Sequence, residues 1–162
     1  QGMFDIPPIL WAFRKYHPKF VSKIELGKGI PSISYNWRRG GAALIDRKDG
    51  KQAISEFVKF SKNINEKQWS AVIFPEGTRS RTGEPKRFAP NGLKILAKFN
   101  KDGYVVPLTI NNSWEVFKYG KFPFGIGSSV KIITHEPIKI DSLPFNELFE
   151  KTETIIKEHI QS

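Results

Sequence analysis

The chain alternates between short apolar runs and segments in which apolar residues recur at helical spacing. Short apolar runs bounded by Gly, Pro or Asp are typical of buried strands, and three- to four-residue spacing indicates helices. Strands are expected at residues 20–26, 42–46, 70–74, 104–110 and 130–134, and helices at residues 7–16, 50–64, 91–100 and 144–160. Because strands and helices alternate, we predict an α/β fold: a single domain over residues 1–162 whose mixed, mostly parallel sheet is flanked by helices.

The stretch from Trp114 to Ile126 fits neither period, because aromatic residues are mixed there with Lys and Gly. One interpretation is a loop packed on the core. The other is a surface that touches lipid, since aromatic rings and Lys suit a membrane interface. The second interpretation relies on Trp114, Phe122 and Phe124.

The charge of the chain points to an anionic partner. There are 26 Lys and Arg against 16 Asp and Glu, which gives a net charge of +10. Nucleic acid, an anionic membrane surface and a phosphorylated substrate all fit such a surplus. The basic residues are scattered and no nucleic-acid motif occurs, so we expect no nucleic-acid partner.

The residue types that are missing exclude several chemistries. The sequence has no Cys, which rules out disulfides, thiolate metal sites and Cys nucleophiles. His17, His135 and His159 are far apart in the sequence, so neither a metal site nor a cofactor is expected. Each of these His is interpreted as a surface or capping residue. No apolar run approaches the roughly 18–20 residues that span a bilayer, and no signal-peptide pattern occurs.

A polar cluster directly follows the strand expected at 70–74. Ligand sites of α/β sheets gather at the carboxyl ends of strands. Gly77 can adopt a positive φ or let a ligand approach the backbone closely. Arg79 can bind a phosphate through two parallel hydrogen bonds, and Thr78 and Ser80 can add hydroxyl donors. For a motif this short, a solvated polar turn is the alternative.

The string Phe74-Pro75-Glu76-Gly77-Thr78-Arg79-Ser80 resembles the third signature block of the glycerolipid acyltransferases, of the 1-acyl-glycerol-3-phosphate acyltransferase type. Three further segments resemble other blocks in the same order. Gln1–Asp5 is similar to the first block, a His followed by four residues and an Asp, with the His expected directly before Gln1. Gly41–Arg47 and Val105–Ile110 are similar to the second and fourth blocks.

The resemblance implies transfer of a fatty acyl group from a thioester to a hydroxyl, and it implies roles for the first and third blocks. The expected His takes the proton from the attacking hydroxyl, and Asp5 orients that His. Glu76 hydrogen-bonds the glycerol hydroxyl or braces the Arg residues. Gly77 allows close approach, and its backbone N–H is a candidate donor to the oxyanion. Because the sequence lacks the expected His, we expect this chain by itself to be inactive.

The implied acceptor, lysophosphatidate, carries a phosphate and therefore needs a cationic clamp. Its expected members are Lys23, Arg47, Thr78, Arg79 and Ser80. Pro107 is expected to shape the pocket wall or to be a plain strand-edge residue. Phe88–Gly92 keeps the Phe and Gly that follow the third block in the family but lacks the basic pair between them.

The resemblance further implies acyl-CoA or acyl-carrier protein as the donor and association with the cytoplasmic face of a membrane. Two alternatives stay open. The same fold could acylate another phosphate-bearing or lysophospholipid acceptor, because Arg residues favour a phosphate without choosing among phosphates. The chain could also be a non-catalytic module that binds anionic lipid, as its charge allows.

Overall fold

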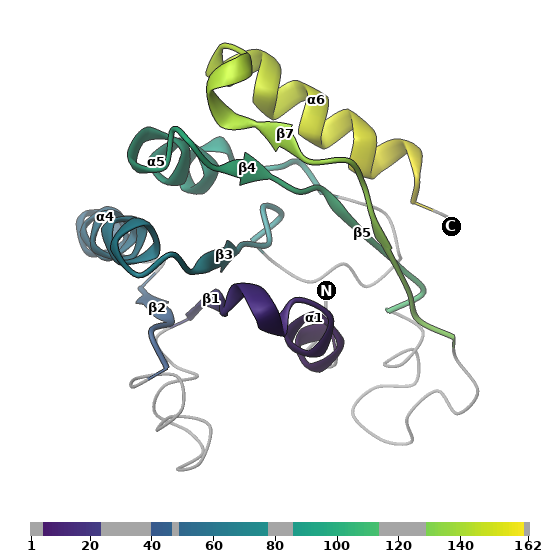
Figure 1. Ribbon diagram of the computed structural model, residues 1–162, viewed down its shortest axis with the longest axis horizontal. Helices are drawn as coiled ribbons and strands as arrows, with labels where there is room; N and C mark the ends of the chain where they lie inside the picture. The colour runs from purple at the N-terminus through teal and green to yellow at the C-terminus, as the bar shows by residue number, and fades with distance from the viewer. Residues whose placement is uncertain (1–4, 24–39, 47–48, 78–85, 114–128, 161–162) are drawn as a thin grey trace. The chain divides into compact units, whose positions relative to one another are not determined.

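The computed structural model describes residues 5–23, 40–46, 49–77, 86–113 and 129–160 (Figure 1). The chain divides into two compact units. The first unit comprises residues 1–9, 75–90 and 102–162, and the second comprises residues 10–74 and 91–101. Near the N-terminus, α1 (Ile6–Ala12) is followed by the short 3-10 helix η2 (Arg14–Tyr16).

The second unit is built on a parallel sheet in the order β2-β1-β3. The strands are β1 (Pro18–Lys23), β2 (Ala43–Ile45) and β3 (Ser70–Val72). In the register, Val21 of β1 is opposite Ala43 and Phe20 is opposite Val72. The helix α4 (Gly50–Glu66) connects β2 to β3 and so provides the crossover that these parallel strands require (Figure 1), and α5 (Pro90–Phe99) follows β3.

One apolar cluster forms the core of the second unit. It contains Ala43, Phe60, Ile64 and Leu96, with Val21, Trp69, Ala71 and Ile73 packed against it. The helical spacing of Phe60 and Ile64 places both on the buried face of α4. The two helices are also tied by polar contacts, because the Asn100 side chain donates to the Ser61 hydroxyl over 3.0 Å and Ser61 is fully buried.

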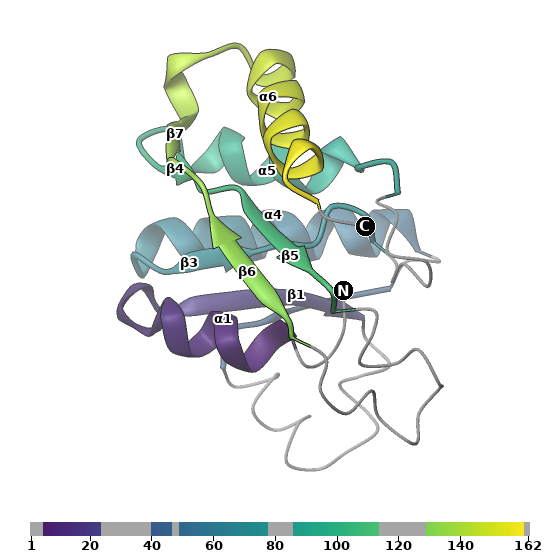
Figure 2. The same ribbon diagram turned by 90° about the vertical axis from the view of Figure 1, so that its right-hand side faces the viewer.

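The first unit contains two antiparallel strand pairs and the last helix. β4 (Tyr104–Val105) pairs with β7 (Ile138–Lys139), and β5 (Leu108–Asn111) pairs with β6 (Lys131–Thr134). Figure 2 shows β5 and β6 side by side. A short 3-10 helix, η4 (Ile140–Ser142), leads into α6 (Phe145–Glu158), which packs on β5.

The expected α/β class, with parallel strands flanked by helices, is confirmed. The single strand expected at 104–110 is wrong, because Pro107 separates β4 from β5 and the two strands pair with different partners. Pro107 has no N–H to donate to a ladder, and its carbonyl accepts from the backbone N–H of His135 over 3.0 Å. The strand expected at 70–74 ends at Val72, and its residues are half-buried rather than buried.

The stretch Trp114–Ile126 lies outside the described residues. The single domain over residues 1–162 stays a prediction.

Gly41 provides a test of this packing. Its φ is +81°, and a Cβ there would lie 2.5 Å from a ring carbon of Trp69, a residue packed against the core of the second unit. We expect Gly41→Ala to lower the free energy of unfolding by about 2–4 kcal/mol, since backbone strain and overlap with the ring add. Urea unfolding followed by circular dichroism measures this.

The matched control is Gly50→Ala at the first residue of α4, where an added Cβ meets nothing within 4 Å. We expect that variant to change stability by less than about 1 kcal/mol and in the stabilising direction. Equal effects of the two substitutions would contradict the proposed role of Gly41.

Candidate functional site

In the second unit, the parallel pairing of the strands places the residues that follow them at one edge of the sheet. β1, β2 and β3 run in the same direction, so their carboxyl ends lie at one edge of the sheet. Lys23 is the last residue of β1, Asp46 follows β2, and Ile73 and Phe74 follow β3. The rings of Phe20 and Phe74 stack with centroids 6.3 Å apart, which holds the segment that leaves β3 against β1.

Gln52 fixes the path of the chain after β2. Its side-chain carbonyl accepts from the backbone N–H of Asp46 over 2.8 Å, and its amide donates to the carbonyl of Leu44 over 3.2 Å. Asp49 caps α4 by accepting from the backbone N–H groups of Lys51 and Gln52. The end of β2 and the start of α4 are thereby clamped on either side of residues 47–48.

Sequence reasoning missed Gln52. A polar residue in the first turn of an expected helix that directly follows an expected strand was the available signal, and the structure shows its side chain half-buried.

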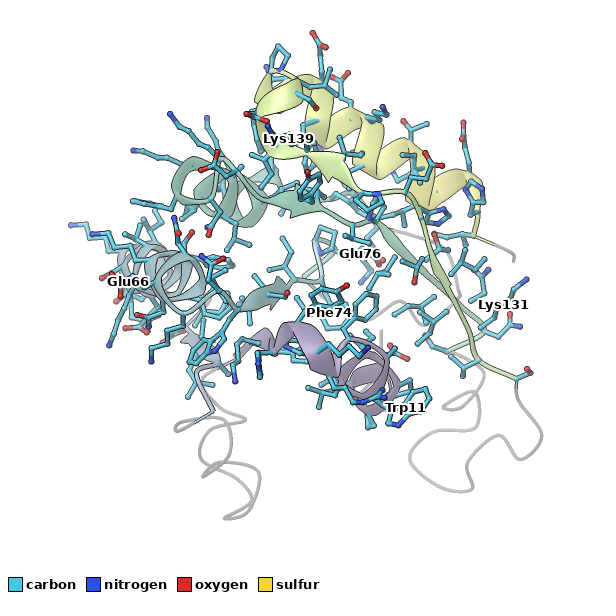
Figure 3. All side chains as sticks on the ribbon, viewed as in Figure 1. Trp11, Glu66, Phe74, Glu76, Lys131 and Lys139 are labelled. Carbon is cyan, nitrogen blue, oxygen red and sulfur yellow. The ribbon has the colours of Figure 1, made fainter. Side chains whose placement is uncertain are left out.

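In the first unit, residues 75–77 and 86–89 are held side by side. The backbone N–H of Ala89 donates to the carbonyl of Pro75 over 2.9 Å, and the Glu76 carboxylate accepts from the backbone N–H of Lys86 over 3.3 Å. Figure 3 labels Glu76. Gly77 has a φ of +68°, so the positive φ that its residue type allows is adopted. The two described stretches 75–77 and 86–89 are therefore fixed to each other.

Asp5 is buried directly before α1, with 1% of its surface exposed. A carboxylate at such a position is costly unless it is hydrogen-bonded or paired. Its burial therefore agrees with a carboxylate that has a fixed task, as the first signature block implies, rather than with a solvated surface charge.

The remaining expected site residues cannot be placed. Arg47, Thr78, Arg79 and Ser80 lie outside the described residues, and for Lys23 only the backbone is described, in β1. The roles of these residues, and those of Asp5, Glu76 and Gly77, stay predictions.

Two of the three histidines lie at the ends of helices, and the third contacts one of them. His17 is exposed and ends η2 with a φ of +48°. His159 caps α6, and its Nδ1–H donates to the carbonyl of Ile155 over 2.8 Å. His135 stacks on His159 with ring centroids 4.5 Å apart, and its Nε2 lies 2.8 Å from the hydroxyl of Thr109. His17 and His159 confirm the expected capping role, whereas the stacked pair was not predicted.

The hydrogen bonds of Thr109 define the tautomer of His135. The Thr109 hydroxyl donates to the carbonyl of Ile156 over 3.3 Å, so it accepts from His135, whose Nε2 then carries the proton. Asn111 donates to the carbonyl of His159 over 3.0 Å, and both polar side chains of β5 are buried. Together these contacts fasten the end of α6 to β5.

Burial, and after it the positive charge of the neighbouring His159, lower the pKa of His135 below its ordinary value of 6.5. The folded state therefore favours neutral His135.

The described residues contain neither a metal-binding cluster nor a helix that could span a membrane. Within the ranges that the structure describes, no group of three or more His, Asp or Glu side chains could hold a metal ion. Among the helices in those ranges, none combines the length and the apolar character needed to cross a bilayer.

The fold thus defines an α/β protein whose parallel strands end at one edge of their sheet. Comparison with known sequences identifies the family. The Acyltransferase family matches residues 1–111, so the chain belongs to that family.

Three relatives illustrate the similarity. A 1-acyl-sn-glycerol-3-phosphate acyltransferase of Helicobacter pylori is 38% identical over 108 residues, which cover 63% of this chain and 43% of the relative. A chloroplastic protein of the same name from Brassica napus is 29% identical and covers 85% of this chain and 38% of its own. The crystal structure of the 1-acyl-sn-glycerophosphate (LPA) acyltransferase PlsC from Thermotoga maritima superposes with a TM-score of 0.73 and 28% identity, covering 98% of this chain and 60% of that one. The matched part therefore spans about two fifths of the length of the Helicobacter pylori and Brassica napus relatives.

The His135 contacts predict a pH dependence of stability. Because the folded-state pKa is below the unfolded value, the unfolded chain binds the proton first as pH falls, so stability is full above about pH 7 and declines as pH falls through 6.5. His135→Gln keeps a donor for Thr109 but removes the titrating group. We expect its urea midpoint to fall less than that of the unmodified protein between about pH 8 and about pH 5.

His17→Asn is the control, because Asn tolerates the positive φ and the change removes an exposed imidazole that does not contact Thr109. If the two variants show the same pH slope, the assignment to His135 is wrong.

Proposed function

We propose that this chain is the catalytic body of an enzyme that transfers a fatty acyl group from acyl-CoA or acyl-carrier protein to the free hydroxyl of 1-acyl-glycerol-3-phosphate, giving phosphatidate. The observation that carries the proposal is the common name of the relatives: proteins from a bacterium and a plant, and a solved bacterial structure, are all acyltransferases for this acceptor. The buried Asp5 and the fixed Glu76-Gly77 turn support it, since they occupy the first and third signature blocks.

In the proposed reaction, the acceptor hydroxyl oxygen attacks the carbonyl carbon of the thioester. The His expected before Gln1 removes the hydroxyl proton as the C–O bond forms, and Asp5 holds that His in the required tautomer. The tetrahedral intermediate then collapses, the C–S bond breaks, and the proton passes to the departing thiol. The products are an ester and a free thiol, so atoms and electrons balance without a cofactor.

The Glu76-Gly77 turn has two proposed tasks. Its half-buried carboxylate accepts the hydrogen bond of the glycerol hydroxyl or braces the neighbouring Arg residues. A Gly at a φ of +68° carries no Cβ, so its N–H can point at a closely approaching oxyanion. We assign the acceptor phosphate to Lys23, Arg47 and Arg79, with Thr78 and Ser80 as hydroxyl donors.

We also propose that the protein works at the cytoplasmic face of a membrane. The acceptor and the product are lipids, and the net charge of +10 attracts the chain to anionic headgroups.

The base is tested with protein that is extended upstream of Gln1 and carries either His or Ala directly before Gln1. We expect acyl transfer with His and a loss of at least about a thousandfold in kcat with Ala. Asp5→Asn in the His form should lower kcat by about 10²–10⁴ with little change in KM, because the wrong tautomer of the base forms. Release of CoA thiol measures both rates, and thermal melting checks that the variants are folded.

Equal activity of the His and Ala forms would refute the mechanism. An acceptor panel of lysophosphatidate, glycerol-3-phosphate and lysophosphatidylcholine separates the proposed acceptor from its alternatives. A preference for either of the last two would move the activity to another acceptor of the same fold.

The phosphate clamp is tested at Arg79. We expect Arg79→Ala to raise KM for lysophosphatidate by about a hundredfold, and Arg79→Lys to recover part of this, because Lys keeps the charge but not the bidentate geometry. Arg87→Ala is the matched control, since it removes an exposed Arg that lies two residues after the range 78–85, which contains Arg79. Equal KM values for Arg79→Ala and Arg87→Ala would show that overall charge, not a specific clamp, binds the phosphate.

A further inference from the structure

The segment of α1 and η2 exposes large apolar side chains although its inner face is already buried. Ile9 is 1% exposed, whereas Leu10 is 42%, Tyr16 is 61% and Trp11 is 72% exposed. Figure 3 shows Trp11 at the end of α1. A helix in water normally turns one apolar face to the core and a polar face to solvent. Leu10, Trp11 and Tyr16 instead expose apolar side chains within seven consecutive residues, and exposed apolar side chains gathered in this way are typical of an interaction site.

Cations accompany these side chains in the sequence of the segment, and anions do not. The guanidinium of Arg14 lies 5.0 Å from the centroid of the Trp11 ring and donates to the backbone carbonyl of Trp11 over 2.8 Å. Lys15 is exposed beside it. The sequence has no Asp or Glu between Asp5 and Glu25. The local charge is therefore positive, in a chain that is already strongly cationic.

The combination of an indole ring, an aliphatic side chain and long cationic side chains matches the boundary between lipid headgroups and acyl chains. Trp prefers this layer because its ring is apolar and its N–H is polar, and Arg and Lys reach from it to phosphates. We propose that Leu10, Trp11, Arg14, Lys15 and Tyr16, here called the Trp11 patch, dock the protein on an anionic lipid bilayer. Leu10 and Trp11 enter the acyl boundary, and Arg14 and Lys15 bind headgroup phosphates.

Charge argues for lipid and against a second copy of the chain. A two-fold contact would bring each copy's Arg14 and Lys15 into the same small area, and both copies carry a net charge of +10. An anionic bilayer offers the opposite charge and an apolar interior for Trp11 and Leu10 at the same time.

The Trp11 patch deepens the proposed function and rests on it for its biological purpose, because an acceptor of the lysophosphatidate class resides in a bilayer. In the sequence, Trp11 follows Asp5 by six residues, with α1 starting directly after Asp5. Docking would therefore hold a lipid surface at the segment that begins with the first signature block.

The test is flotation of the full chain with vesicles of phosphatidylcholine, with and without about 30% phosphatidylglycerol, at low and high salt. We expect binding to the anionic vesicles that weakens with salt. Trp11→Ala should lower the partition coefficient by about tenfold or more, and Arg14→Gln with Lys15→Gln by about thirtyfold, taking about a factor of five for each cation.

Two controls match these changes. Ile54→Ala removes an exposed apolar side chain of α4, which is 57% exposed. Lys59→Gln with Lys151→Gln removes two exposed cations from α4 and α6. If the Trp11 patch is the docking surface, we expect each control to alter the partition coefficient by less than about twofold, because neither control changes a residue of the patch.

Three results would overturn the inference. Trp11→Ala could bind as the unmodified protein does, the control pair of Lys substitutions could weaken binding as much as the Arg14 and Lys15 pair, or Trp11→Ala could convert a dimer to a monomer in size-exclusion chromatography without changing vesicle binding. The last result would identify a second copy as the occupant. Because Trp11, Arg14 and Lys15 are exposed, circular dichroism should show folded variants.

A paired activity assay separates failure of docking from failure of the proposed function. In protein extended upstream of Gln1 with His directly before it, Trp11→Ala should keep its rate with a short-chain lysophosphatidate that is monomeric in water. With acceptor embedded in vesicles its kcat/KM should fall about tenfold, as its binding does. Loss of both rates would place Trp11 in the site instead of the docking surface. If no variant transfers an acyl group but vesicle binding still depends on Trp11, the docking inference stands and the proposed function fails.

Discussion

The second unit depends on the position of β1 between β2 and β3. Both neighbours pair with β1 in parallel, so a single direction is imposed on all three strands and their carboxyl ends must share one edge. Parallel strands need crossover helices, and α4 supplies Phe60 and Ile64 to the core that covers the sheet. The residues that follow the strands, Asp46 after β2 and Ile73 and Phe74 after β3, then lie at that shared edge.

Hydrogen bonds and one aromatic stack fix the segments that follow the strands. Gln52 clamps the chain around Asp46, and Phe74 stacks on Phe20 after β3. In the first unit, two hydrogen bonds join residues 75–77 to residues 86–89, and Gly77 adopts a conformation that other residues rarely take. Chemistry that needs fixed donors is favoured by such segments, since a donor that is already held in place loses little entropy when a ligand binds.

Local sequence signals predicted most of the fold. The helical spacing of Ile54, Phe57, Val58 and Ile64 predicted α4, and the apolar run before Asp46 predicted β2, because each element buries a face within its own length. Sequence could not resolve β4 from β5, where the apolar pattern continues through Pro107 and only the different partners separate the strands. For the candidate site, the strand ends and the signature blocks predicted which segments of the chain carry it. The positive φ of Gly77 was one of the two possibilities that its residue type allowed.

The contacts that sequence missed join residues that are distant in the chain. His135 meets Thr109 and His159 because β5 and β6 pair and α6 returns over β5, and no local pattern of these three residues indicates that meeting. The exposed side chains at Trp11 have the opposite character: they are neighbours in sequence, where a helix was predicted, but the sequence does not indicate which apolar residues of that helix are exposed. Only the observed burial of Ile9 shows that the inner face of α1 is already filled. A run of apolar residues in a sequence therefore does not tell whether they are buried in the protein core or are exposed for contact with a partner or a membrane. The observed exposure of each side chain distinguishes the two.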